Sequence, residues 1–238
     1  MRLDLYIAEK CVLSRTRAQN LIKTGGVLLG GKPMDKPSQE VAEGAEITIV
    51  DTLKYASIGG LKLENALRTF GIDPKGRTAI DIGAANGGFT DCLLQMGASE
   101  VCAVDLNVAF PPSLSEDSRV RIYDGVNVKN LPEIFRGRRF DLVTADLSFI
   151  SLCGLFPIFS SLLSENGSMI LLFKPQFEVG KKHLPKSGIV RDEKAIRTAF
   201  SAFCDAAAQA GLTFVGECPV PPVFPDKNKE RTVCFCLK

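Results

Sequence analysis

A glycine-rich turn between an apolar strand and a helix is the part of this chain best suited to carry chemistry. It lies within residues 81–90 and has the spacing G-x-x-x-G-G, formed by Gly83, Gly87 and Gly88. A turn that follows a strand and opens a helix is typical of a nucleotide-type cofactor site. Seventeen residues after Gly88, the next apolar run ends in Asp105, a carboxylate that suits ribose hydroxyls.

The order of the glycines distinguishes between two kinds of cofactor. A dinucleotide fold uses G-x-G-x-x-G, with the pyrophosphate at the helix N-terminus, and the second glycine of that pattern is missing here. Asp81, two residues before the first glycine, is unfavourable beside a pyrophosphate but suits the ammonium and sulfonium groups of S-adenosylmethionine. The spacing therefore favours a methyl donor over NAD. The alternative is a purely structural corner, since any parallel α/β protein needs small residues there.

Two further polar residues follow buried apolar runs. Asp146 ends the run 140–145, and Lys174 ends the run 169–173 and precedes a proline. In an open parallel sheet, ligands bind at the carboxyl ends of the strands. A lysine is costly in such a place unless a carboxylate pairs with it, and Asp146 is the expected partner of Lys174. The pair could also be structural only.

Alternating strand and helix patterns must position these residues. Apolar runs predict strands at 78–81, 101–105, 120–123, 140–146, 168–174, 213–217 and 232–237. Amphipathic helices are predicted over 61–70 and 193–210. The alternation predicts an α/β fold of the Rossmann-like type, with a seven-stranded, mostly parallel sheet covered on both faces.

The first 50 residues have a different pattern, that of a small α+β unit. A short helix begins at Leu3, a second is predicted over 15–23 with Ser14 as its N-cap, and short strands follow at 27–29 and 47–49. The first 36 residues hold seven Lys and Arg against three acids. This excess is the footprint of nucleic-acid binding, although a solvated surface explains it about equally well. We expect a small domain over 1–52, a linker over 53–61 and a catalytic domain over 62–238.

Composition excludes several classes of protein. The 238 residues contain no apolar run of the roughly 18 to 20 residues that a membrane span needs, and no signal peptide opens them. We therefore expect a cytoplasmic protein with no membrane partner. The eight cysteines form no C-x-x-C pair and predict buried, reduced thiols. With His183 as the single histidine, no metal site is expected.

Several motifs resemble known families. The pattern S-R-x-x-A-x-x-L-I-x-x-G over 14–25 is similar to a small RNA-binding module of a small-subunit ribosomal protein, pseudouridine synthases and some tRNA synthetases. The motifs D-I-G-x-x-x-G-G-F-T-D-x-L-L at 81–94, D-L-S-F-I-S-L at 146–152, K-P-Q-F-E-V-G at 174–180 and G-I-V-R-D at 188–192 together resemble the TlyA family. That family comprises ribosomal RNA 2′-O-methyltransferases, often labelled haemolysins, with an FtsJ-type domain behind the same RNA-binding module.

The resemblance implies a site and a substrate. A cytidine ribose in ribosomal RNA would receive the methyl group of S-adenosylmethionine, with a monomer favoured and no metal involved. Lys174 would take the proton of the 2′-hydroxyl, Asp146 would orient that lysine, and Lys62 and Glu230 would position the ribose. The implied cofactor residues are Asp81, Gly83, Gly87, Gly88, Phe89 and Asp105, with Asp124 and Asn127 beside the adenine. The implied RNA contacts are Arg2, Arg15, Arg17 and Lys23.

Three departures from the family pattern leave other functions open. Ile58 stands where the family commonly has arginine, the segment 106–112 differs around the cofactor, and Lys227 replaces a glycine. One alternative is therefore a ribosome-binding or RNA-binding protein with impaired catalysis. A second is a membrane-active haemolysin, as the family label suggests.

Overall fold

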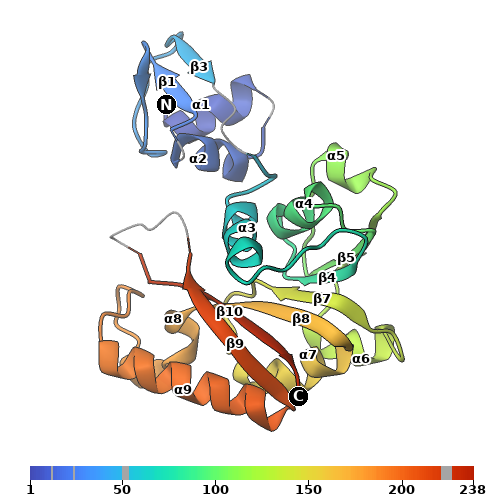
Figure 1. Cartoon of the computed structure of the whole chain (residues 1–238). Helices are drawn as coiled ribbons and strands as arrows, with labels where there is room; N and C mark the ends of the chain where they lie inside the picture. The colour runs from blue at the N-terminus through green and yellow to red at the C-terminus, as the bar shows by residue number, and fades with distance from the viewer. Residues whose placement is uncertain (12, 24, 50–53, 221–226) are drawn as a thin grey trace.

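The polypeptide forms a small N-terminal module and a larger α/β domain. The computed structural model describes residues 1–11, 13–23, 25–49, 54–220 and 227–238. Figure 1 shows the module in blue beside the larger domain, where the colours run from cyan to red. The predicted boundary at residue 52 and the start of the predicted linker at residue 53 lie outside the described residues.

The N-terminal module packs two helices against a small sheet. Its elements are α1 (Leu3–Lys10), α2 (Arg15–Lys23), β1 (Val27–Leu29), β2 (Lys32–Pro33) and β3 (Ile47–Ile49), and its antiparallel sheet has the order β2-β1-β3. The predicted N-cap is confirmed, because the backbone N–H of Arg17 donates to Ser14 Oγ at 3.2 Å. Side chains from both helices, among them Leu3 and Leu21, are buried in one core. The predicted α+β unit is thus confirmed.

A seven-stranded sheet forms the centre of the larger domain. Its strands are β4 (Thr78–Ile82), β5 (Glu100–Asp105), β6 (Val120–Asp124), β7 (Phe140–Ala145), β8 (Leu163–Phe173), β9 (Leu212–Pro219) and β10 (Arg231–Leu237). The order is β6-β5-β4-β7-β8-β10-β9, in which β10 runs antiparallel to both neighbours and the other pairings are parallel. The order reverses between β4 and β7, and ligands of open sheets bind at such a switch point. The predicted Rossmann-like sheet is confirmed.

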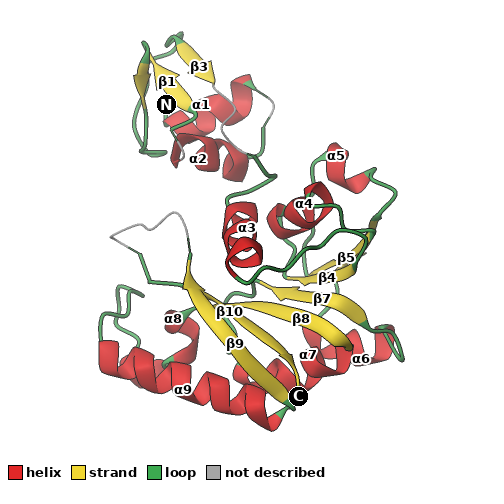
Figure 2. Ribbon diagram, viewed as in Figure 1, coloured by secondary structure: helices red, strands yellow, loops and turns green. Residues whose placement is uncertain are grey.

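Helices cover both faces of this sheet (Figure 2). On one face lie α3 (Gly59–Thr69) and α4 (Gly88–Gln95), and on the other lie α6 (Leu131–Ile134), α7 (Phe156–Leu162) and α9 (Glu193–Gln209). Two further short helices, α5 (Pro112–Ser115) and α8 (Pro175–Glu178), lie in connections. Helix α3 buries Leu63, Ala66 and Leu67, whose spacing of three and four residues forms one helical stripe. The strands between the two helical layers are accordingly apolar on both faces.

Some details differ from the predictions. Helix α3 begins at Gly59 rather than at residue 61, because backbone turns from Ser57 and Ile58 lead directly into it. Strand β8 begins five residues earlier than expected, at Leu163. Cysteine burial was predicted for all eight thiols, but Cys11 is exposed and three others are partly exposed. In the described ranges, no helix is long and apolar enough to cross a membrane.

Candidate active site

The glycine turn lies against the end of strand β7. Gly83 has a φ of 88°, a left-handed conformation that favours glycine. A Cβ atom at Gly83 would lie 2.7 Å from the backbone oxygen of Asp146, so a side chain does not fit there. The turn therefore approaches Asp146 closely.

Asp81 lies behind the turn and has no exposed surface. Its carboxylate accepts hydrogen bonds from Thr90 Oγ1 at 2.7 Å and from Thr144 Oγ1 at 3.2 Å. Burial raises the pKa of Asp81 to about 7, and the negative charge of Asp146 adds to the rise. The prediction placed this carboxylate beside a cationic cofactor. In the structure this carboxyl group is fully buried and joins β4, β7 and α4 behind the turn.

Asp105 is partly exposed at the end of β5. Its two carboxylate oxygens accept backbone hydrogen bonds from Ala85 and Asn107, each at 3.0 Å. A carboxylate has about four lone-pair positions, so two stay available for ribose hydroxyls. The residues present therefore fit the ribose of S-adenosylmethionine, with the glycine turn beside it.

The other predicted cofactor residues shape the same edge of the sheet. Asp124 Oδ1 accepts from the backbone N–H of Val108 at 2.7 Å, and Asn127 Oδ1 accepts from the backbone N–H of Lys129 at 3.0 Å. Phe89 is buried beneath the turn. A Cβ atom at Gly87 would lie 2.5 Å from the side chain of Leu114, and one at Gly88 would collide with Ser57 Oγ. These contacts hold the segment 106–112 and the linker against the glycine turn.

Three of the four predicted catalytic residues line one cavity, and the fourth, Lys174, pairs with one of them. Lys174 Nζ lies 2.6 Å from Asp146 Oδ1 and donates a hydrogen bond to Ser148 Oγ at 2.8 Å. The contact with Asp146 is an ion pair only, because no hydrogen bond reaches Oδ1 with suitable geometry. Lys62 Nζ lies 2.7 Å from Glu230 Oε2 and joins α3 to the segment before β10. The expected pairing of Lys174 with Asp146 is thus present.

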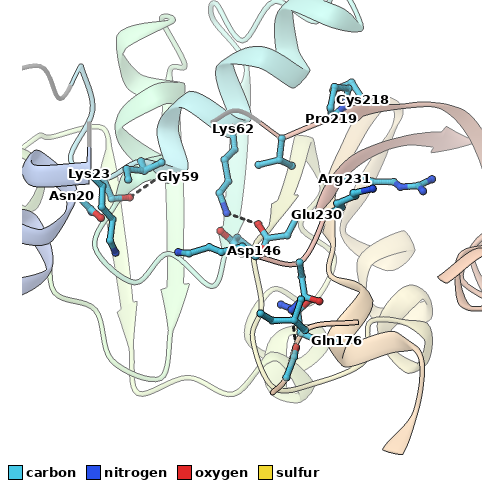
Figure 3. A pocket seen from close by; sticks show the side chains of 18 of the residues that line it. Asn20, Lys23, Gly59, Lys62, Asp146, Gln176, Cys218, Pro219, Glu230 and Arg231 are labelled. Carbon is cyan, nitrogen blue, oxygen red and sulfur yellow. Dashed lines mark hydrogen bonds and ion pairs between the residues drawn. The ribbon is translucent and has the colours of Figure 1, made fainter. Parts of the chain in front are cut away.

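The cavity has a volume of about 860 Å³. Lys62, Asp146 and Glu230 line it, and Asn86 of the glycine turn lies at its edge. Figure 3 shows Lys62 and Glu230 pointing toward one another, with Asp146 close by. Lys174 is only 7% exposed and is not among the described residues that line the cavity. The lining instead holds the pair Lys62 and Glu230 and the carboxylate of Asp146, which pairs with Lys174.

Asn228 links the motif G-I-V-R-D to the segment before β10. Its Oδ1 accepts from the backbone N–H of Val190 at 2.8 Å, and its Nδ2 donates to the backbone oxygen of Gly188 at 2.8 Å. The backbone N–H of Glu230 in turn donates to the carbonyl of Asn228 at 3.0 Å. The motif G-I-V-R-D therefore holds the segment that carries Glu230.

Sequence reasoning missed Glu178, which ties the loop after β7 to α8. Its carboxylate accepts from Ser151 Oγ at 2.6 Å and from the backbone N–H of Leu152 at 2.8 Å. The loop after β7 carries Asp146, and α8 follows Lys174 directly. Only a weak signal was available, a single acid within the motif K-P-Q-F-E-V-G.

Replacing Glu178 by glutamine is expected to loosen this loop. A glutamine offers one acceptor oxygen where two carboxylate oxygens now accept, so one donor is left unpaired at a cost of about 1–3 kcal/mol. Amide hydrogen exchange over 148–153 should become faster, and the thermal midpoint should fall. Glu165→Gln, at an exposed position on β8, is the matched control and should change neither quantity. Unchanged exchange in Glu178→Gln would show that the carboxylate does not hold the loop.

Phe149 was also missed, although it stands three residues after Asp146. Its side chain is 91% exposed, and its φ of 67° is unusual for a residue other than glycine. The ring centre of Phe149 lies 5.3 Å from that of Phe177 in α8. A large exposed aromatic in a strained backbone conformation is costly for the free protein, and such strain clusters at functional sites. No sequence pattern reveals a positive φ at a phenylalanine.

The predicted RNA contacts of the module fall into two groups. Asp4, which has no exposed surface, binds Arg2 Nε at 3.0 Å and Arg15 Nε at 3.1 Å. The hydrogen bond from Arg2 holds the pKa of Asp4 well below its usual range. Arg2 and Arg15 are thus held side by side and partly exposed, whereas Arg17 lies further along α2. Lys23, at the end of α2, instead lines the cavity of the larger domain.

Metal ligands are not grouped in this site. Among the residues that the structure describes, no cluster of three or more His, Cys, Asp or Glu side chains could hold a metal ion.

Comparisons with known proteins agree with this geometry. Residues 55–236 match the family model described as FtsJ-like methyltransferase, and residues 1–47 match the S4 domain. The chain is 37% identical to the 16S/23S rRNA (cytidine-2′-O)-methyltransferase TlyA of Mycobacterium tuberculosis strain H37Rv, over 91% of this chain and 82% of that protein. It is 36% identical to Hemolysin A of Brachyspira hyodysenteriae, over 86% of this chain and 88% of that protein.

A solved structure shares the complete architecture. The putative hemolysin from Streptococcus thermophilus aligns with a TM-score of 0.78 and 31% identity, covering 100% of this chain and 88% of the other. More distant S-adenosylmethionine-dependent methyltransferases, such as one from Listeria monocytogenes at 12% identity and a TM-score of 0.56, share the fold of the larger domain. With both family models, high coverage and the same fold, this chain belongs to the TlyA family of FtsJ-like methyltransferases that carry an N-terminal S4 domain.

Proposed function

We propose that this chain transfers the methyl group of S-adenosylmethionine to the 2′-hydroxyl of a cytidine ribose in ribosomal RNA. The observation that carries the proposal is the convergence of two ion pairs, Lys174 with Asp146 and Lys62 with Glu230, on one cavity beside the glycine turn. Relatives at 34–37% identity are named as 16S/23S or 23S rRNA (cytidine-2′-O)-methyltransferases, which supports this substrate.

The cofactor would lie along the carboxyl ends of β4 and β5. Asp105, whose two carboxylate oxygens each accept one backbone hydrogen bond, would bind its ribose hydroxyls. A cation bound nearby would favour the ionised form of Asp81, whose pKa burial raises to about 7. S-adenosylmethionine, when bound, supplies an electrophilic methyl group. Asp124 and Asn127 would shape the adenine side of the pocket through the loops that they tie together.

Lys174 would act as the base. Its side-chain nitrogen would take the proton of the 2′-hydroxyl as that oxygen becomes a nucleophile. The product of this proton transfer is an ammonium group, and Asp146, 2.6 Å away, would stabilise its charge. Asp146 would also fix the direction of the lysine, with help from Ser148 at 2.8 Å.

Lys62 and Glu230 would align the ribose. Each is about one-fifth exposed and each is fixed by the other, so both present a held polar group to the cavity. Glu230 would accept a hydrogen bond from a ribose hydroxyl, and Lys62 would donate one. Because displacement at a methyl carbon needs an in-line nucleophile, most of the rate enhancement is expected from this alignment.

Phe149 would stack on the base of the target nucleotide. RNA-modifying enzymes take unpaired bases onto aromatic side chains, and such stacking is worth about 1–3 kcal/mol per base. Phe149→Ala is therefore expected to lower kcat/KM for the RNA by roughly 5- to 100-fold. The measurement is methyl transfer to unmethylated ribosomal subunits at saturating cofactor. Phe149→Tyr keeps an aromatic face and should retain most of the activity; equal losses in both variants would contradict a stacking role.

The S4 module and the catalytic domain would have different roles. The S4 module, proposed as residues 1–52, would bind RNA through Arg2, Arg15, Arg17 and Lys23, and a linker over 53–61 would join it to the catalytic domain. We propose that the protein works as a monomer in the cytoplasm, where its ribosomal substrate lies, without a metal or a membrane partner.

Mapping ribose methylation tests the proposed function most directly. Ribosomal RNA from cells with and without the gene should differ at defined cytidines, and purified protein should restore the missing 2′-O-methyl groups. An RNA-binding protein with impaired catalysis would bind the subunits and leave the two maps identical. A haemolysin would lyse pure lipid vesicles, which a methyltransferase of this design is not expected to do.

A further inference from the structure

Ile58 belongs to the larger domain by sequence, yet its side chain packs against the core of the S4 module. It lies within residues 55–236, which match the FtsJ-like methyltransferase model, and it directly precedes α3. The core of the S4 module consists of buried side chains between Leu3 and Val41, and Ile58 is half-buried against them. Across the described ranges, Ile58 is the residue that the larger domain contributes to this core.

The segment that carries Ile58 is held by helix α4 of the larger domain. The backbone N–H of Ala56 donates to Asp91 Oδ2 at 2.7 Å, and Gln95 Nε2 donates to the backbone oxygen of Lys54 at 2.9 Å. Both acceptor and donor side chains belong to α4, which begins in the glycine turn. The segment therefore keeps a fixed place on the larger domain, and a contact of Ile58 with the S4 core ties the two domains together.

Helix α2 of the S4 module reaches the catalytic cavity at the same place. Asn20 and Lys23 of α2 line that cavity together with Ser57, Ile58 and Gly59. Figure 3 shows Asn20 and Lys23 beside Gly59, the first residue of α3. The position of the S4 module relative to α3 therefore determines the shape of one wall of the cavity.

An apolar side chain at this position has a different effect from a charged one. Two domains joined by a short segment move relative to one another unless an apolar contact holds them. Isoleucine supplies such a contact, because its burial is favourable in proportion to the apolar area removed from water. The arginine that the family commonly has at position 58 would keep its charged head in water. Ile58 therefore favours a docked S4 module more than an arginine would.

We propose that Ile58 is a positioning residue that fixes the S4 module on the catalytic domain before RNA binds. The effect on catalysis rests on the proposed function, whereas the contact itself does not. With the module fixed, its RNA-binding side chains and the catalytic cavity keep a constant separation. RNA that binds the module then presents its target ribose to the cavity directly, because the two domains are already ordered in the free protein.

Nuclear magnetic resonance relaxation of the free protein tests the contact. In the wild type, amides of the S4 module and of the catalytic domain should report one rotational correlation time, because the two domains tumble as one body. Ile58→Gln removes the apolar contact without adding a charge, so the correlation time of the module should become clearly shorter than that of the catalytic domain. Ile58→Leu keeps an apolar side chain and should behave as the wild type. Ile134→Gln, at an exposed isoleucine of α6, is the matched control and should change neither correlation time.

Steady-state kinetics on unmethylated ribosomal subunits test the positioning role. When the module is docked only part of the time, the apparent affinity for the subunit falls with the docked fraction. Ile58→Gln is therefore expected to raise KM for the subunit roughly tenfold and to keep kcat within about twofold, since the bound complex is the same. Ile58→Leu and Ile134→Gln should both keep KM close to the wild-type value.

Three outcomes would overturn the proposal. The two domains of the wild type could tumble separately, or Ile58→Gln could still tumble as one body, and either result rejects the contact. Ile58→Gln could also tumble as two bodies with an unchanged KM, which rejects the positioning role. Absence of methyl transfer by the wild type would reject the proposed function, and the relaxation experiment would still decide whether Ile58 joins the two domains.

Discussion

Replacing Lys174 by methionine is expected to lower the rate of methyl transfer by about 10²- to 10⁴-fold, the usual contribution of a positioned base. Methionine has a similar length, fits the buried position and cannot take a proton. Single-turnover transfer to unmethylated subunits at saturating cofactor measures the chemical step directly. Cofactor binding, followed by calorimetry, should change much less, because the contacts of Lys174 are with Asp146 and Ser148.

Lys174→Arg is the sharper variant at the same position. Arginine keeps a positive charge beside Asp146, so the ion pair at 2.6 Å has a replacement and the fold should survive. A guanidinium stays protonated in proteins, however, and cannot serve as a base. Both variants should therefore lose activity to a similar extent. A wild-type rate in Lys174→Arg would show that the lysine contributes charge alone and that the base lies elsewhere.

The free energy of unfolding is expected to fall by about 4 kcal/mol as the pH rises from about 4 to 7, through Asp81 alone. Burial raises the pKa of Asp81 to about 7 from its ordinary value of 3.8. Between these values the folded protein keeps a proton that the unfolded chain has released. Stability from this group is complete below about pH 4, decreases as the pH rises, and becomes constant above about pH 7.

Asp81→Asn isolates this contribution. Asparagine has the same shape and stays neutral, and the hydroxyls of Thr90 and Thr144 can either donate or accept toward it. Urea unfolding of both proteins at pH 5 and pH 8 gives the comparison. The change in the free energy of unfolding between pH 5 and pH 8 should be smaller in the variant by several kcal/mol. Groups that titrate equally in both proteins cancel in this comparison. Equal pH dependence in the two proteins would mean that Asp81 titrates near its ordinary value.

Local patterns were sufficient to predict the pair Lys174 and Asp146. Each residue ends an apolar run, parallel strands place their carboxyl ends at one edge of a sheet, and β7 and β8 are neighbours. The pairing of Lys62 with Glu230 could be expected only from the family resemblance. These residues are 168 positions apart, on a helix and on the segment before an antiparallel strand, and no periodicity connects them.

Other features depend on packing that a linear pattern does not encode. The alternation of apolar and polar residues does not reveal that Asp81 is buried between Thr90 and Thr144. Its burial depends on how α4 and β7 pack against β4. The role of α2 as a cavity wall depends on how the two modules meet. The strained, exposed Phe149 depends on a turn that Glu178 anchors from another motif.

The order of the last three strands has a consequence for synthesis on the ribosome. Strand β10 follows β9 and β8 in the sequence, yet it lies between them in the sheet. The hydrogen bonds that β8 and β9 form with β10 can therefore form only after residues 231–237 have left the exit tunnel. Glu230 immediately precedes this strand, so the partner of Lys62 arrives with the same segment. The cavity that we propose as the active site is thus incomplete until the last strand of the sheet has been inserted between its two neighbours.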